Sequence, residues 1–295
     1  MVCGNATLYP HREKGYVRPG LADAASGSRQ VEFACVFRES FVTILLAIGF
    51  TVVALIYSSV GFGGGSTYTA LLLFSGLDIF LIPIVSLVCN LTVTSAGVWK
   101  STRAGLFKNS GVFNILVFSV PAAFLGGITP VSREMLVLLL GGALLVAGLQ
   151  LGWITLNVKS PDAEIKRRVP TFAAPVIGTA VGYLSGVVGI GGGIFLAPIL
   201  HLVGWTSPRK IAALASAYIA ANSFAGFAGK YLSIPAEVDK SVLLEFWPLI
   251  PAVIIGSFFG HRFMLGMFPE RVVKGMTAAL ILFVAVRLLL RSFTS

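Results

Sequence analysis

Two almost identical glycine-rich stretches decide how this chain folds. They read Val60-Gly-Phe-Gly-Gly-Gly65 and Val188-Gly-Ile-Gly-Gly-Gly193. Neither can remain a regular helix, because each glycine costs about 1 kcal/mol relative to alanine in a helix interior. Each stretch is followed directly by an apolar run, 65–76 and 193–204, of about 18 Å if helical. A hydrocarbon core is about 30 Å thick, so these runs are too short to cross it alone.

The composition indicates a membrane protein. Hydrophobic residues make up 56% of the 295 residues and charged residues only 12%, whereas a soluble domain carries about 25% charged residues. We therefore expect an all-α, multi-pass protein that is embedded in the lipid bilayer. This expectation excludes the soluble enzyme classes. The excess of 22 Lys and Arg over 12 Asp and Glu is the ordinary bias of membrane topology, and no basic tract predicts a nucleic-acid partner.

Ten apolar segments follow the polar start of the chain. Eight reach or approach the length that spans a bilayer, and the two runs after the glycines do not. Ten crossings, or eight crossings with two re-entrant segments, both fit this pattern, and they lead to different orientations. The segments are 40–60, 65–76, 79–99, 111–129, 134–156, 171–188, 193–204, 209–229, 242–261 and 270–290.

Further landmarks recur in the same order after each glycine stretch. Asn90 matches Asn222, the Pro-Ala-x-x-x-Gly motif that begins at Pro121 matches the one at Pro251, and Glu134 matches Glu270. This register predicts two repeats of five segments each, which are inverted if every segment changes sides. The expected parts are a disordered arm (1–38), a first repeat (39–156), a polar linker (157–169) and a second repeat (170–292).

The short helices after the glycines are candidate anion sites. Their first amides lack intrahelical acceptors, the helix dipole adds partial positive charge, and glycine lets a ligand approach the backbone closely. Close helix packing is the competing interpretation of such glycines, and an interhelical hydrogen bond is the competing interpretation of each asparagine. The predicted substrate-binding residues are Gly61, Gly63, Gly64, Gly65, Ser66, Thr67, Asn90, Gly189, Gly191, Gly192, Gly193 and Asn222.

Lys100 and Lys230 end two of the long segments. Snorkelling to the interface is the default for such lysines, and attraction of anions to the mouth of a path is the alternative.

The acidic and nucleophilic residues argue against other chemistry. Every carboxylate falls in the arm, a loop or a segment end, whereas cation transporters commonly keep an acid at mid-membrane depth. The histidines, His11, His201 and His261, are too scattered for a metal cluster. We expect no enzyme activity, no cofactor and no bound metal. A metal-cation permease that uses backbone carbonyls at the same breaks, or a non-transporting scaffold, stays open as an alternative.

At the two glycine-rich breaks the sequence resembles the sulfite exporter TauE/SafE family, also called the 4-toluene sulfonate uptake permease family. The likeness rests on the two Gly-x-Gly-Gly-Gly breaks and covers roughly residues 40–292. It implies a multi-pass permease of the plasma or inner membrane for a small anion, such as sulfite or another sulfur-containing anion or organosulfonate. The family motif implies that the breaks 61–65 and 189–193 belong to the binding site, whereas the assignment of Asn90 and Asn222 to it is our own inference. The anion, the direction of transport, the coupling ion and the oligomeric state stay open.

Overall fold

The computed structural model describes most of the membrane part of the chain. The described residues run from 42 to 263, except 60, 76, 109–111, 158–172, 203–204 and 206–207, with scattered residues from 275 to 290. The arm 1–38 and all of the linker except Asn157 lie outside them. Contacts divide the chain into Met1–Leu46 and Ala47–Ser295, and the packing given below is that of the second unit.

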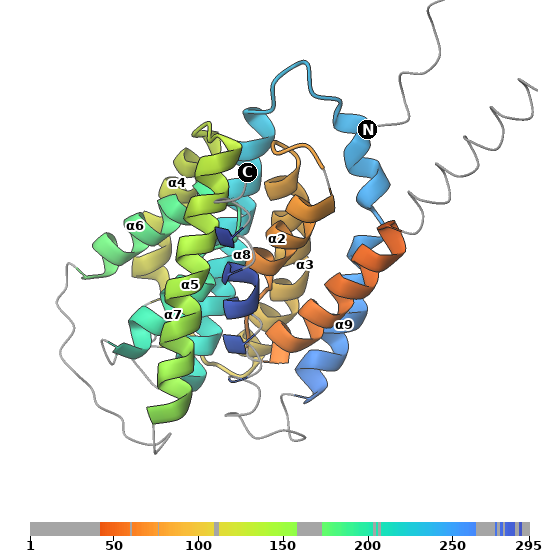
Figure 1. The fold of residues 1–295 in the computed structure, drawn as a ribbon. Helices are drawn as coiled ribbons and strands as arrows, with labels where there is room; N and C mark the ends of the chain where they lie inside the picture. Colours follow the sequence, from red (N-terminus) through yellow and green to blue (C-terminus); the bar gives the residue numbers. More distant parts are fainter. Residues whose placement is uncertain are drawn as a thin grey trace, which may run out of the picture. The chain divides into compact units, whose positions relative to one another are not determined.

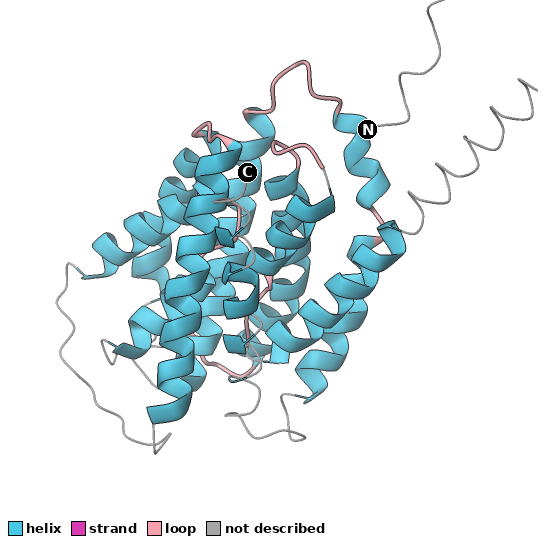
Figure 2. Ribbon diagram, viewed as in Figure 1, coloured by secondary structure: helices cyan, strands magenta, loops and turns pink. Residues whose placement is uncertain are grey.

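Every described element is helical, as predicted (Figures 1 and 2). Eight of the ten predicted apolar segments each coincide with one described helix, and the ninth corresponds to η1 and α9 together. About half of the tenth is described, and that half is helical. The helices are Val42–Ser59, α2 (Gly65–Ser75), α3 (Ile82–Arg103), α4 (Val112–Ile128), α5 (Arg133–Asn157), α6 (Ala173–Val188), α7 (Gly193–Leu202), α8 (Pro208–Leu232), the 3-10 helix η1 (Lys240–Phe246) and α9 (Leu249–Phe263).

Four described helices are long and apolar enough to cross a membrane. A fifth span forms if η1 and α9 are taken together across a 41° bend. The helices α4 and α6 contain 17 and 16 residues, about 25 Å at 1.5 Å per residue, so they are somewhat shorter than a full span. The half-length segments begin directly after the glycines, as predicted, because α2 has 11 residues and α7 has 10.

Small residues bring α4 and α6 into backbone contact. A methyl group on Gly182 would lie 2.5 Å from the carbonyl oxygen of Ser119, and one on Gly186 would overlap the carbonyl oxygen of Ala123. Such small residues four positions apart let membrane helices approach closely. Gly182 and Gly186 therefore serve the close packing of α4 on α6.

The helix α9 packs in the same way on the first described helix. Methyl groups on Gly256 and Gly260 would overlap the carbonyl oxygens of Thr51 and Leu55, and the Thr51 hydroxyl donates to the carbonyl of Ala252 at 3.2 Å. Thus α4, from the first half of the chain, packs on the helix that precedes the second glycine stretch. Conversely, α9 packs on the helix that precedes the first.

The long helices α3 and α8 pack against each other, and each also packs on a half-length helix, α2 on α3 and α7 on α8. This pairing places both glycine stretches beside the same two long helices, where the candidate site is found.

Candidate functional site

The two glycine stretches share a left-handed backbone conformation at two matched pairs of positions, and they differ at a third pair, where Gly191 has a φ angle of 74° and Gly63 is not left-handed. Gly61 and Gly64 have φ angles of 86° and 87°, and Gly189 and Gly192 have φ angles of 74° and 73°. This left-handed region is one that residues with a side chain rarely adopt. Each stretch therefore makes a sharp turn that only glycine accommodates without strain.

Each turn ends by starting a half-length helix. The carbonyl of Gly64 accepts hydrogen bonds from the amides of residues 67 and 68, both at 3.0 Å, and the carbonyl of Gly192 accepts from those of residues 195 and 196, both at 3.1 Å. The next amides, those of Gly65 and Gly193, are then the first of α2 and α7, and a helix cannot satisfy its own first amides.

One buried side chain of α3 joins the two stretches. The Asn90 Oδ1 atom accepts from the backbone amide of Gly65 at 3.2 Å. Its Nδ2 atom donates to the carbonyl of Ile190 at 3.1 Å and to the hydroxyl of Ser223 at 3.1 Å. Asn90 is 1% exposed. The two breaks therefore lie within the reach of a single amide, and α3 and α8 both contribute to the contact.

The glycines make this approach possible. A methyl group on Gly65 would lie 2.9 Å from both Asn90 Nδ2 and the carbonyl oxygen of Ile190, and methyl groups on Gly63 and Gly191 would overlap the Asn90 amide. A side chain at any of these positions would push Asn90 out of the space between the breaks.

Asn222, which the predicted repeat matches to Asn90, has a different environment. It is completely buried, and neither its Nδ2 nor its Oδ1 atom has a hydrogen-bond partner among the described residues. The residue of α8 that meets Asn90 is its neighbour Ser223. Ser223 is not among the residues predicted from the sequence, because serine on an apolar helix readily bonds to its own helix. The available signal was its spacing of two turns from Ser216, which also faces a break.

Hydroxyl groups of the long helices hold the first break. The carbonyl of Gly61 accepts from Ser216 Oγ at 2.8 Å, and that of Gly65 accepts from Ser86 Oγ at 2.7 Å. The predicted site residue Thr67 bonds through its Oγ1 atom to the Tyr57 hydroxyl at 2.8 Å. Ser66, which was also predicted as a site residue, is buried next to Thr67. Neither Ser86 nor Ser216 was singled out from the sequence.

The electrostatics of the breaks are set by amides rather than by charges. The positive end of the α2 dipole meets the neutral Oδ1 oxygen of Asn90. Among the described residues, every carboxylate is at least partly exposed, and no three His, Cys, Asp or Glu side chains are grouped as metal ligands would be. An anion oxygen in the place of Asn90 Oδ1 would make a charge-assisted bond to the same amide, which is about twice as strong as a neutral one.

Comparison with known proteins places these features in a family. Residues 45–288 match the family model described as sulfite exporter TauE/SafE. The chain is 31% identical over 221 residues to the probable membrane transporter protein y4hK of Sinorhizobium fredii, an alignment that covers 74% of this chain and 88% of the relative. It is also 24% identical over 269 residues to the probable membrane transporter protein MamO of Paramagnetospirillum magneticum, covering 77% of this chain and 41% of that protein. No solved structure matches the chain.

Proposed function

The chain belongs to the sulfite exporter TauE/SafE family, and from that premise we propose that it is a secondary transporter of a small anion. The substrate class is sulfite or another sulfur-containing anion, including organosulfonates. The anion binds between the starts of α2 and α7, at the residues that the glycine stretches and Asn90 bring together.

The observation that carries this proposal is the contact of Asn90 with both breaks. Its amide reaches Gly65 on one side and Ile190 on the other, each within 3.2 Å. A ligand of similar size that replaced this amide would therefore touch both halves of the chain at once. This is the arrangement expected of a transporter whose site lies between two discontinuous helices.

Anion binding at this place is an exchange of hydrogen bonds. A substrate oxygen displaces the neutral Asn90 oxygen from the Gly65 amide and makes a stronger, charge-assisted bond there. Asn222 supplies a second donor, because its buried amide has no partner among the described residues. Leaving such a group unpaired costs about 1–3 kcal/mol, and this free energy is recovered when a ligand pairs with it.

The exchange also suggests how binding is coupled to movement. The bond from Asn90 to Ile190 fastens the second break to α3, and its loss would release that break. We further propose that 39–156 and 170–292 are inverted repeats. The matched φ angles of the breaks and the reciprocal packing of α4 on α6 and of α9 on the first described helix support this relation.

The alternative of a cation permease finds less support at the breaks. It requires backbone carbonyls that are free to coordinate an ion. The carbonyls of Gly61, Gly65 and Ile190 each accept a hydrogen bond from a side chain of α3 or α8, so a cation would have to displace these donors.

Flux of ³⁵S-sulfite into proteoliposomes tests the proposal, with Asn90→Asp as the diagnostic variant. Aspartate can still accept from the Gly65 amide, but its negative charge repels an anion and attracts a cation. Wild-type protein should give saturable uptake that sulfate or propanesulfonate inhibits. Asn90→Asp should reduce uptake by at least about tenfold, the effect of one charged hydrogen bond.

Asn114→Asp is the matched control. It makes the same chemical change on an exposed position in the first turn of α4, where a negative charge suits the helix dipole, so uptake should stay within about twofold of wild type. Absence of anion uptake by folded wild-type protein would refute the transport proposal. Retained sulfite uptake by Asn90→Asp would refute the site.

A further inference from the structure

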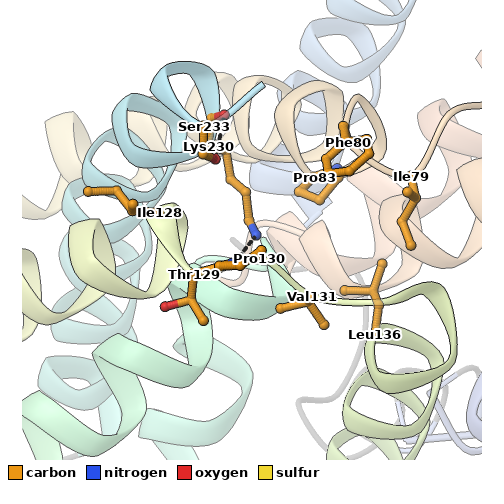
Figure 3. Close-up of a pocket in the computed structure, with 10 residues that line it drawn as sticks. All are labelled: Ile79, Phe80, Pro83, Ile128, Thr129, Pro130, Val131, Leu136, Lys230 and Ser233. Carbon is orange, nitrogen blue, oxygen red and sulfur yellow. Dashed lines mark hydrogen bonds between the residues drawn. The ribbon is translucent and has the colours of Figure 1, made fainter. Parts of the chain in front are cut away.

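A cavity of about 280 Å³ lies at one end of the long helices α3 and α8 (Figure 3). A water molecule takes about 30 Å³ of liquid volume, so the cavity has room for a small organic or inorganic anion. Its lining is mostly apolar, and the one charged group in it is Lys230, whose side chain extends from the last turn of α8 into the cavity. The lining residues are Ile79, Phe80, Pro83, Ile128, Thr129, Pro130, Val131, Leu136, Lys230 and Ser233.

The charge of Lys230 is poorly compensated. Its Nζ atom donates to the carbonyl of Thr129 at 3.4 Å, which is long for an N–H···O bond, and this is the one partner recorded for it in the described part of the chain. The carboxylates nearest in sequence to the lining, Asp78 and Glu134, do not line the cavity, and Asp78 Oδ1 accepts instead from the Phe80 amide at 3.0 Å.

Helix ends around the cavity do not cancel the lysine. The helices α3 and α5 begin beside it, and α4 and α8 end beside it. Each start carries about half a positive elementary charge and each end about half a negative one. These contributions offset one another, so the net charge facing the cavity is that of Lys230.

The cavity lies on the same helix faces as the contact between the breaks. Pro83 is seven residues before Asn90 on α3, and Lys230 is seven residues after Ser223 on α8. Seven residues are two turns, about 10 Å, and return to the same face. Pro83 also touches the second break directly, because a methyl group on Gly189 would lie 2.9 Å from its Cα atom.

We infer that the Lys230 cavity is a separate binding site for a small oxyanion, which an anion occupies before it reaches the breaks. The apolar walls favour an anion that carries a short apolar group over an inorganic one of the same charge. The role as an entry site rests on the proposed function, but binding to the cavity can be measured at equilibrium without transport.

The test is calorimetric titration of the purified full-length protein with propanesulfonate, and with its neutral analogue propanesulfonamide. Propanesulfonate should bind and the sulfonamide should not. Lys230→Gln should raise the dissociation constant on the order of ten- to a hundredfold, the effect of losing a charged partner. Lys230→Arg should retain most of the affinity.

Lys108→Gln is the matched control, because it removes the same charge from an exposed turn after α3, and its dissociation constant should stay within about twofold of wild type. Equal weakening by Lys230→Gln and Lys108→Gln, or wild-type binding by Lys230→Gln, would overturn the inference. If Lys230→Gln does not fold, Val131→Trp serves instead. It fills the cavity from a loop and keeps the lysine. It should remove the propanesulfonate binding that depends on Lys230, whereas binding at the breaks would remain; undiminished affinity in this variant would equally overturn the site.

An anionic lipid headgroup has the same chemistry as a free oxyanion, so the titration is repeated in nanodiscs. The dissociation constant should be the same in phosphatidylcholine alone and with phosphatidylglycerol added. Competition by phosphatidylglycerol that disappears in Lys230→Gln would identify a lipid site and overturn the inference. Sulfite flux by Asn90→Asp and Asn114→Asp tests the proposed function separately, because neither residue lines the cavity.

Discussion

Replacing Asn90 by leucine should destabilise the protein, whereas replacing Asn222 by leucine should not. The two residues occupy matched positions of the predicted repeat, both are buried in long helices, and leucine has the same branched shape and number of heavy atoms as asparagine. They differ in their partners: Asn90 makes three hydrogen bonds to other elements, whereas Asn222 has none among the described residues.

The size of the difference follows from these bonds. Asn90→Leu leaves the amide of Gly65 and the carbonyl of Ile190 buried without their side-chain partner, at about 1–3 kcal/mol each in water-soluble proteins and about 0.6–2 kcal/mol for bonds within a bilayer. We expect a loss of about 2–4 kcal/mol. Asn222→Leu breaks no described bond and removes an unpaired amide, so it should be neutral or stabilise by up to about 2 kcal/mol.

The free energy of unfolding is measured by SDS titration in mixed micelles, followed by far-UV circular dichroism, and sulfite flux is measured on the same preparations. Asn222→Leu should reduce flux although the protein is at least as stable as wild type, because the proposed site loses a donor. Destabilisation by both variants to within about 1 kcal/mol of each other would show that the hydrogen bonds of Asn90 do not join the halves. Wild-type flux in Asn222→Leu would remove Asn222 from the site.

Three glycine substitutions test the packing by the same SDS titration. Gly63→Ala should destabilise by about 1–3 kcal/mol, because its methyl would overlap the Asn90 amide; unchanged stability would mean that the first break is loosely packed. Gly186→Ala should cost a similar amount by separating α4 from α6 at Ala123, and wild-type stability would contradict that contact. Gly142→Ala is the matched control inside α5, where nothing described lies within 4 Å of the new methyl. It should be neutral or stabilise by up to about 1 kcal/mol. A clear loss of stability in this control would undermine the other two results.

Much of the fold could be predicted because its signals are local. An apolar run of bilayer length must bond its backbone internally and becomes a helix, and a run of glycines must interrupt it. The starts of α2 and α7 at Gly65 and Gly193 follow directly. The bend of 41° between η1 and α9 was not predicted, although Pro248 lies at the break and proline interrupts a helix.

The candidate site was only partly predictable. The glycines at both breaks and Asn90 were chosen from the sequence, and the structure brings them together. The sequence did not predict the contact of Ser223 with Asn90 or the hydroxyls that bond to Gly61 and Gly65. It also did not predict that Lys230 lines a cavity. A serine on an apolar helix looks the same in sequence whether it bonds to its own helix or to another one.

From the amino-acid order alone came the helical class, the membrane environment, the two interrupted segments and the family resemblance, because hydrophobicity and glycine content act on residues close together in the chain. Only the tertiary structure decided that one asparagine touches both interruptions, that its counterpart has no hydrogen-bond partner among the described residues, and that a lysine two turns after Ser223 lines a cavity. Those facts depend on which faces α3 and α8 turn toward each other. That choice is made by packing between residues a hundred or more positions apart, which no local pattern encodes.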